Sequence, residues 1–137
     1  MDRLFLDANI LFSAAYSTAT RLRLIWALTD VELVSSPFAV QEAQINLALA
    51  RPSQLPDLLQ LLGAITVIPD PPAGAMLPAG IQLSDKDRLI LLSAINGQTT
   101  HLLTGDLKHF GRYFGQRIAG VLIQRPAAYL QSRQSSP

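Results

Sequence analysis

The sequence predicts an α/β domain in which a parallel sheet is covered by helices on both faces. Short, strongly apolar segments alternate along its 137 residues with stretches of helical length. Strands that are buried on both faces appear as continuous apolar runs, and their alternation with helices is typical of parallel sheets. Apolar residues make up 49% of the chain, and the length fits one ordinary domain rather than two.

The composition excludes several classes of protein. Only 15% of the residues are charged and the net charge is +1, so no strong overall field draws the protein to nucleic acid. The chain has no cysteine, which excludes disulfides, thiolate metal sites and cysteine nucleophiles and fits a reducing compartment. No apolar run reaches the ~18–20 residues of a membrane span, and the start lacks the basic region of a signal peptide. We therefore expect a cytoplasmic protein without membrane segments.

The first part of the chain contains two predicted strands and two predicted helices. Residues 3–7 form a short, buried strand. Residues 20–29 carry an apolar stripe at helical spacing and begin at a threonine that can cap a helix. The β-branched, alternating segment 31–36 is the second strand. The Ser-Pro pair at its end is typical of a helix start and predicts a helix over 37–50.

The middle of the chain contains one predicted strand and two predicted helices, the second of them very apolar. Residues 53–62 form a helix that a glycine ends, and residues 64–69 form the third strand. Residues 69–83 are rich in Pro, Gly and Ala, which predicts a connector without regular structure. The sequence SDKD then begins a helix over 84–96 that is apolar enough to lie in the centre of the fold.

The last part completes the alternation of strands and helices. It contains a strand over 100–106, a short polar helix over 107–114, a strand over 118–123 and a helix that begins with a proline. Residues 1–130 therefore make up the predicted domain. Residues 131–137 are polar, and we expect them to form a disordered tail.

Four of the ten acidic residues occupy positions that are typical of a functional site. Asp7 ends the first strand, and Asp106 follows the fourth. Glu42 interrupts an otherwise apolar face of the helix over 37–50, and Asp87 lies in the first turn of the central helix. Ligands bind at the carboxyl ends of parallel strands, so we expect these four side chains to converge at one edge of the sheet.

Each of these residues also has an ordinary structural interpretation. Asp7 can cap the helix that follows it, and Asn9 can be a simple turn residue. Glu42 can extend to solvent at the edge of its helix. Ser84 and Asp87 form a capping-box pattern, which by itself holds the start of a helix.

Four carboxylates within a few ångströms need a compensating charge. At neutral pH they repel one another and cannot all stay ionised without one. A divalent cation supplies that charge, and oxygen ligands without histidine or cysteine suit Mg²⁺ or Mn²⁺ rather than zinc. We therefore expect Asp7, Glu42, Asp87 and Asp106 to form a magnesium or manganese site of the kind that supports phosphoryl transfer.

Four segments of the chain, in this order and at this spacing, resemble the PIN domain, a family of small metal-dependent ribonucleases. The matching segments are FLDANIL, SPFAVQEAQINL, SDKDRLILLSAI and HLLTGDLKHFG. The resemblance covers about residues 3–130. It implies a three-layer α/β/α domain with a five-stranded parallel sheet of order 3-2-1-4-5.

The resemblance also implies an activity and partners. Many bacterial members of the family are toxins of toxin–antitoxin pairs, which implies hydrolysis of RNA phosphodiester bonds, a small antitoxin and a homodimer. Asn9 and Thr104 lie beside the acids and are expected to help bind the substrate or a water molecule, and Arg88 and Lys108 are candidates for contact with RNA phosphates. Solvated helix faces are the other interpretation of these two cations. His109 can donate a hydrogen bond to a phosphate, but a lone histidine beside Phe110 is more often a packing residue, and we favour that interpretation.

Three other functions are compatible with acids at the edge of a parallel sheet. A signalling receiver domain would need an adjacent acid pair after the first strand, which the sequence DAN lacks. An aspartate-nucleophile phosphatase would need a second carboxylate at Asn9, whose amide cannot protonate a leaving group. A non-catalytic PIN-like domain that binds a protein or RNA partner remains the main alternative, although such a binder has no need of four buried acids.

Overall fold

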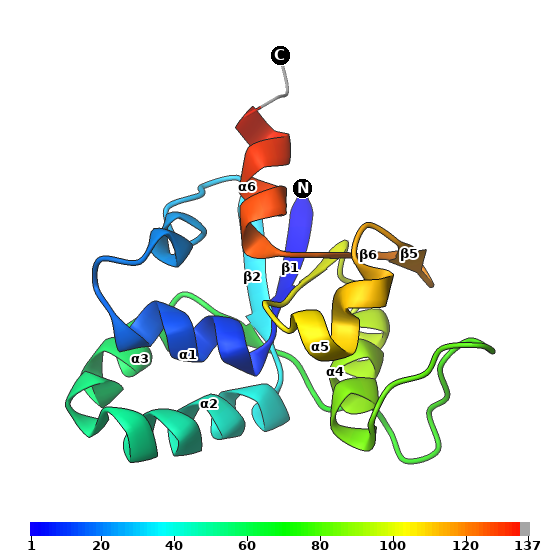
Figure 1. Cartoon of the computed structure of the whole chain (residues 1–137), viewed down its shortest axis with the longest axis horizontal. Coiled ribbons are helices and arrows are strands. Elements are labelled where there is room, and N and C mark those ends of the chain that lie inside the picture. Colours follow the sequence, from blue (N-terminus) through cyan, green and yellow to red (C-terminus); the bar gives the residue numbers. More distant parts are fainter. Residues whose placement is uncertain (135–137) are drawn as a thin grey trace.

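The computed structural model describes residues 1–134 and places a mixed sheet between two layers of helices (Figure 1). The strands are β1 (Asp2–Leu6), β2 (Val31–Ser35), β3 (Thr66–Val67), β4 (His101–Leu103), β5 (Arg117–Ile118) and β6 (Val121–Gln124). The α-helices are α1 (Ala8–Tyr16), α2 (Pro37–Ala50), α3 (Leu55–Leu62), α4 (Asp85–Asn96), α5 (Leu107–Phe110) and α6 (Pro126–Gln134). Short 3₁₀ helices are η1 (Arg21–Leu24), η2 (Pro52–Gln54) and η3 (Gly111–Tyr113).

The sheet has the order β3-β2-β1-β4-β6-β5. Its first five strands are parallel, which confirms the predicted order 3-2-1-4-5 with β6 as the fifth strand. The sixth strand, β5, is an addition to the prediction and pairs antiparallel with β6. The predicted strand over 118–123 is therefore a hairpin. Ala119 and Gly120 form its two-residue turn, and both have positive φ angles, 48° and 88°, as such turns require.

Side chains of the central strands alternate between two apolar cores, one on each face of the sheet. Leu4 and Leu6 pack with the core that α1, α2 and α3 cover. Phe5 and Leu102 pack with the opposite core, which contains the apolar residues of α4. Both faces of β1 are thus buried from Leu4 onward, and this explains why the strand is apolar from Leu4 to Leu6.

The two helices that the sequence predicts most clearly are present with their predicted caps. The Oγ atom of Ser36 accepts a hydrogen bond from the amide of Ala39 at the start of α2. The Oγ atom of Ser84 accepts one from the amide of Asp87 at the start of α4. Residues 90–94 of helix α4, more than one full turn, are all buried, as expected for a central helix.

Two segments near the N-terminus differ from the prediction. Helix α1 begins directly after Asp7, in a stretch to which the sequence analysis assigns no element. The helix expected over 20–29 is reduced to η1 and irregular turns. Part of its apolar stripe nevertheless contacts the core. Ile25 is fully buried, and Trp26 is partly buried, with its indole N–H donating to the carbonyl of Leu61 at 3.0 Å. Tertiary contacts therefore hold this segment without a regular helix.

The end of the chain is more regular than expected. Helix α6 continues to Gln134, so residues 131–134 are helical, and residues 135–137 of the predicted tail lie outside the described residues. Within residues 1–134, no helix has both the length and the apolar character to cross a membrane. The longest, α2, has 14 residues.

Candidate functional site

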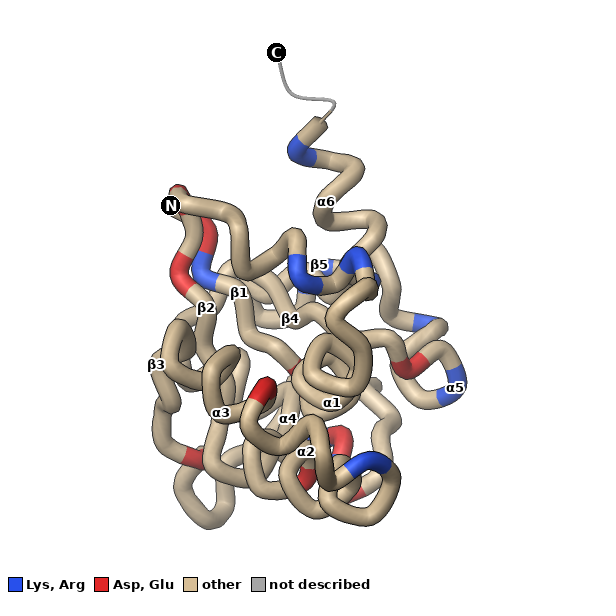
Figure 2. Tube along the Cα trace, turned by 90° about the vertical axis from the view of Figure 1, so that its left-hand side faces the viewer, with Lys and Arg blue, Asp and Glu red and all other residues tan. Residues whose placement is uncertain are grey.

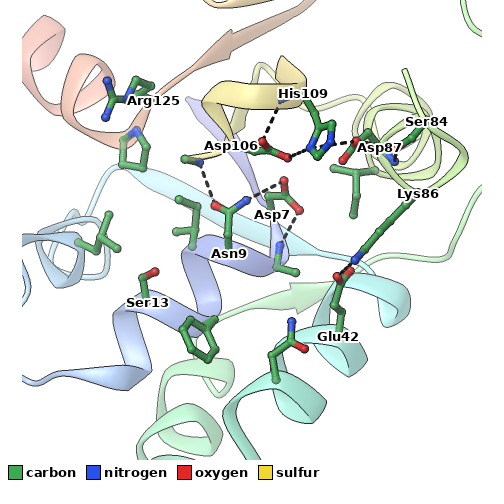
Figure 3. Close-up of a pocket in the computed structure, with 18 of the residues that line it drawn as sticks. Asp7, Asn9, Ser13, Glu42, Ser84, Lys86, Asp87, Asp106, His109 and Arg125 are labelled. Atoms are coloured by element: carbon green, nitrogen blue, oxygen red, sulfur yellow. Dashed lines mark hydrogen bonds and ion pairs between the residues drawn. The ribbon is translucent and has the colours of Figure 1, made fainter. Parts of the chain in front are cut away.

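All four predicted acids line one cavity at the carboxyl edge of the sheet. The cavity has a volume of about 830 Å³ and lies between α1, α2, α4 and α5 (Figure 3). Asp7, Asp87 and Asp106 point toward a common space, and Glu42 faces them from α2. The ends of β1 and β4 bring Asp7 and Asp106 there, because adjacent parallel strands end at the same edge.

Asp7 links the end of β1 to the start of α1. Its Oδ1 accepts a hydrogen bond from the amide of Ala8 at 2.7 Å, so Asp7 is the N-cap of α1. Its Oδ2 accepts from the hydroxyl of Thr104 at 2.9 Å and from the side-chain amide of Asn9 at 3.2 Å. The cap interpretation of Asp7 is thus correct, and it is compatible with the side chain lining the cavity.

The pKa of Asp7 is far from its ordinary value. Burial of the side chain, which is 6% exposed, raises this pKa from 3.8 to about 6. The hydrogen bonds from Thr104 and Ala8 oppose the rise, whereas the negative charges of Asp87 and Glu42 add to it. Burial therefore disfavours the ionised form of Asp7, and the hydrogen bonds that it accepts offset only part of this cost.

Asn9 and Thr104 brace the site. The side-chain amide of Asn9 donates to the Thr104 hydroxyl at 3.1 Å, and its Oδ1 accepts from the amide of Gly105 at 2.9 Å. The Thr104 Oγ1 also accepts from the amide of Asp106 at 3.1 Å. Thr104 is fully buried and does not line the cavity, so it acts on the site through Asp7 and Asp106.

Asp87, Asp106 and His109 form a compact group with potential ligand atoms within 4.8 Å of one another. The Asp106 Oδ1 accepts a hydrogen bond from the amide of His109 at 3.0 Å and thereby caps α5. The imidazole Nδ1 lies 2.7 Å from the Asp106 Oδ2 and 3.7 Å from the Asp87 Oδ2. The hydroxyl of Ser84 donates to that same Asp87 oxygen at 2.7 Å.

His109 is a residue of the site that the sequence analysis misinterpreted. It is not a packing residue, because its ring lies between Asp106 and Asp87 and lines the cavity (Figure 3). The expected ligand set contained only oxygen atoms, and the structure adds an imidazole nitrogen to it. The spacing from Asp106 to His109, i to i+3 in a short helix, is the signal that was available in the sequence.

Glu42 has a partner that the sequence analysis did not assign. Its Oε1 forms an ion pair with the Nζ of Lys86, which comes from the first turn of α4. The hydrogen bond to Glu42 is the main reason that the pKa of Lys86 is raised, and the charges of Asp87 and Asp7 contribute further. Glu42 thus joins the other acids in the cavity but is paired with a side-chain ammonium group.

Arg88 and Lys108 lie on a different surface. They line a second cavity of about 680 Å³, next to the connector between β3 and α4. This cavity shares Ser84 and His109 with the acidic one, so the two are adjacent. Lys and Arg residues are otherwise spread over several elements rather than concentrated on one (Figure 2).

The side chains present fit a divalent cation. Three carboxylates that are partly or fully buried, a fourth on α2 and one imidazole face a single cavity. Carboxylate oxygens are preferred ligands of Mg²⁺ and Mn²⁺, and an imidazole is compatible with transition metals. The raised pKa of Asp7 is consistent with this fit, because a cation bound beside Asp7 would favour its ionised form.

The fold is found in solved structures, although the sequence matches no protein-family model and no curated protein. A chain of VapBC2 from Rickettsia felis, bound to a DNA fragment from its promoter, superposes with a TM-score of 0.65 at 17% identity, covering 90% of this chain and 98% of that one. For VapBC-1 from nontypeable Haemophilus influenzae the TM-score is 0.54 at 16% identity, with coverages of 91% and 98%.

A third similar structure is FitAB bound to the IR36 DNA fragment. Its TM-score is 0.52 at 17% identity, and the match covers 90% of this chain and 94% of that chain. Identities this low carry information about the fold alone. The sheet order, the helix layers and these neighbours agree, and the protein therefore has the PIN-like α/β fold that its sequence resembles.

Proposed function

We propose that the protein is a metal-dependent endoribonuclease that acts in the cytoplasm as the toxin of a toxin–antitoxin pair. The observation that carries this proposal is the gathering of Asp7, Glu42, Asp87 and Asp106 around one cavity of a PIN-like fold. The similar structures come from two-component complexes, VapBC and FitAB, which supports a small protein partner for this chain as well.

The acidic cavity supplies the groups that hydrolysis of a phosphodiester needs. Asp87, Asp106 and His109 would hold Mg²⁺ or Mn²⁺, with Asp7 and Glu42 at the same cavity. When bound, such a cation lowers the pKa of a water molecule and stabilises the negative charge that develops on the phosphate. The chain itself keeps Asp7 and Asp87 in place through hydrogen bonds from Thr104 and Ser84, so little reorganisation is required.

The neighbouring cavity offers a place for the rest of an RNA chain. Arg88 and Lys108 line it, and it adjoins the acidic cavity at His109. Contacts between such cations and phosphates position a nucleic acid without reading its sequence. We propose that these two residues bind phosphates that flank the scissile bond. Asn9 lines the cavity, but its side-chain polar atoms already bond to Asp7, Thr104 and Gly105. We therefore propose that it touches the substrate as part of the cavity wall and does not bind it through a polar contact.

One observation favours a second candidate, a non-catalytic PIN-like domain that binds a protein or RNA partner. The ion pair between Lys86 and Glu42 neutralises one acid of the cavity without any metal ion. In this candidate the acids would serve the fold or a partner, and RNA would stay intact in the presence of every cation.

The test is RNA cleavage by the purified full chain with EDTA, Mg²⁺ or Mn²⁺. We expect cleavage only with a divalent cation, and a loss of at least about 100-fold in Asp87→Asn, since a positioned electrostatic group contributes that much. Asp85→Asn is the matched control, because Asp85 lies in the same turn with a fully exposed side chain and does not line the cavity. Intact RNA under all conditions would favour the binding domain.

The same proposal includes an antitoxin and a homodimer. Expression of the chain alone is expected to slow bacterial growth, and Asp87→Asn is expected to relieve this effect. The mass of the purified protein in solution reports the dimer directly. Normal growth with a protein that is active on RNA would contradict the role as a toxin while leaving the nuclease activity in place.

A further inference from the structure

The contact between Lys86 and Glu42 joins two elements across the acidic cavity. Lys86 belongs to the first turn of α4, and Glu42 lies on α2, more than 40 positions earlier in the sequence. Figure 3 shows the lysine side chain reaching down to the glutamate at the wall of the cavity. The Glu42 side chain is 18% exposed and that of Lys86 is 58% exposed, so the pair lies where the cavity opens to solvent.

The position of Lys86 is unfavourable for the helix on which it lies. The N-terminus of a helix carries partial positive charge, which stabilises acids there and disfavours a lysine. Asp85 and Asp87 lie in the same turn, and their negative charges interact favourably with this end of the helix. The ammonium group is instead attracted by three carboxylates of the cavity, those of Glu42, Asp87 and Asp7. Its location is therefore explained by the acidic cavity and not by the needs of α4.

The four carboxylates of the cavity differ in the groups that stabilise their negative charge. Asp7 has hydrogen bonds from neutral groups, namely the Thr104 hydroxyl, the Asn9 amide and a backbone amide. Asp87 and Asp106 face the imidazole of His109. Glu42 faces a full positive charge. A divalent cation that used Glu42 as a ligand would have to bind beside this ammonium group or displace it.

We propose that Lys86 is an internal cation that competes with the divalent metal ion for Glu42 and so lowers the metal affinity of the cavity. This inference rests on the proposed metal site. The ammonium group partly neutralises the Glu42 carboxylate, and its unit positive charge repels a divalent ion that binds a few ångströms away. Removal of the lysine charge is therefore expected to make metal binding about tenfold tighter, a change that charges at this distance readily produce.

The test is a titration of the full chain with Mn²⁺, followed by calorimetry or by the electron paramagnetic resonance signal of free Mn²⁺. We expect Lys86→Gln to bind Mn²⁺ about tenfold more tightly than the wild type and Lys86→Arg, which keeps the charge, to bind like the wild type. Arg88→Gln is the matched control for charge. Arg88 lies two residues after Lys86 and lines the other cavity. Its Nη1 atom is 3.8 Å from the Oδ1 atom of the exposed Asp85.

A double-mutant cycle tests whether the effect passes through Glu42. In the Glu42→Gln background the ammonium group has lost its partner, so Lys86→Gln is expected to change Mn²⁺ affinity by less than in the wild-type background. An equal gain in both backgrounds, or no gain from Lys86→Gln in a wild type that binds Mn²⁺, would overturn the proposal and leave the metal site intact. Absence of Mn²⁺ binding in the wild type and in Lys86→Gln alike would refute the metal site itself.

Discussion

Asp7 shows how one side chain serves both the fold and the site. The carboxylate caps α1 and lines the acidic cavity, and burial raises its pKa to about 6. A protonated Asp7 would suit its buried position, whereas an ionised Asp7 suits a bound cation. The buried position of Asp7 therefore lowers the stability of the metal-free protein when the carboxylate is ionised, a cost that is common at functional sites.

The raised pKa makes the stability of the metal-free protein depend on pH. The unfolded chain releases the Asp7 proton near pH 3.8 and the folded chain near pH 6, so the folded state binds more protons between these values. Asp7 therefore costs no stability below about pH 4 and a full cost of roughly 3 kcal/mol above about pH 6.

Asp7→Asn removes this titration. We expect the unfolding free energy of the variant, minus that of the wild type, to rise by up to about 3 kcal/mol between pH 4 and pH 7 in EDTA. Urea denaturation at several pH values measures this difference. A constant offset, such as that from the altered bond to Thr104, leaves the slope unchanged. A difference that does not vary with pH would show that Asp7 is ionised in the fold without cost.

At the scale of single elements, helix starts were the most predictable features of this chain. Ser36 before a proline and Ser84 before Asp-Lys-Asp mark helices that begin as predicted, because the cap depends on local backbone geometry. The segment 20–29 was not predictable in this way. Its apolar spacing indicates which side chains are buried, but its backbone follows the contacts of Ile25 and Trp26 rather than a regular helix.

The cap residue of α4, Ser84, also bonds to an acid of the cavity, whereas the cap residue of α2, Ser36, does not. Ser84→Ala removes the bond to the helix amide and the 2.7 Å bond to the Asp87 carboxylate. Ser36→Ala removes only the corresponding helix cap. We expect each variant to lose about 1 kcal/mol of stability in chemical denaturation. Only Ser84→Ala is expected to weaken Mn²⁺ binding, and an equal effect of both variants on Mn²⁺ would argue against the orienting role.

At the scale of the whole molecule, the cavity joins the two halves of the sheet. Its acids come from β1, α2, α4 and the loop after β4, so a cation bound there holds segments together that are distant in the sequence. A ligand that binds only the folded state stabilises it by mass action, by ~2.7 kcal/mol at a concentration 100 times its dissociation constant.

Thermal unfolding of the full chain measures this linkage. We expect Mn²⁺ at that concentration to raise the midpoint by roughly 10 °C relative to EDTA, given the size of the protein. The increase is expected to vanish in Asp87→Asn and to persist in Asp85→Asn, whose side chain is exposed. Equal midpoints with and without Mn²⁺ in the wild type would exclude a cation bridge between these segments.

The sequence alone determined the five parallel strands, the starts of α2 and α4, and the edge of the sheet at which Asp7 and Asp106 lie. Apolar runs and helix starts are local signals, and parallel strands that share an edge place their following residues together. The tertiary structure alone decided which charges meet in the cavity. The ion pair of Glu42 with Lys86 and the approach of His109 to Asp87 depend on how separate elements pack, and no local pattern specifies that packing.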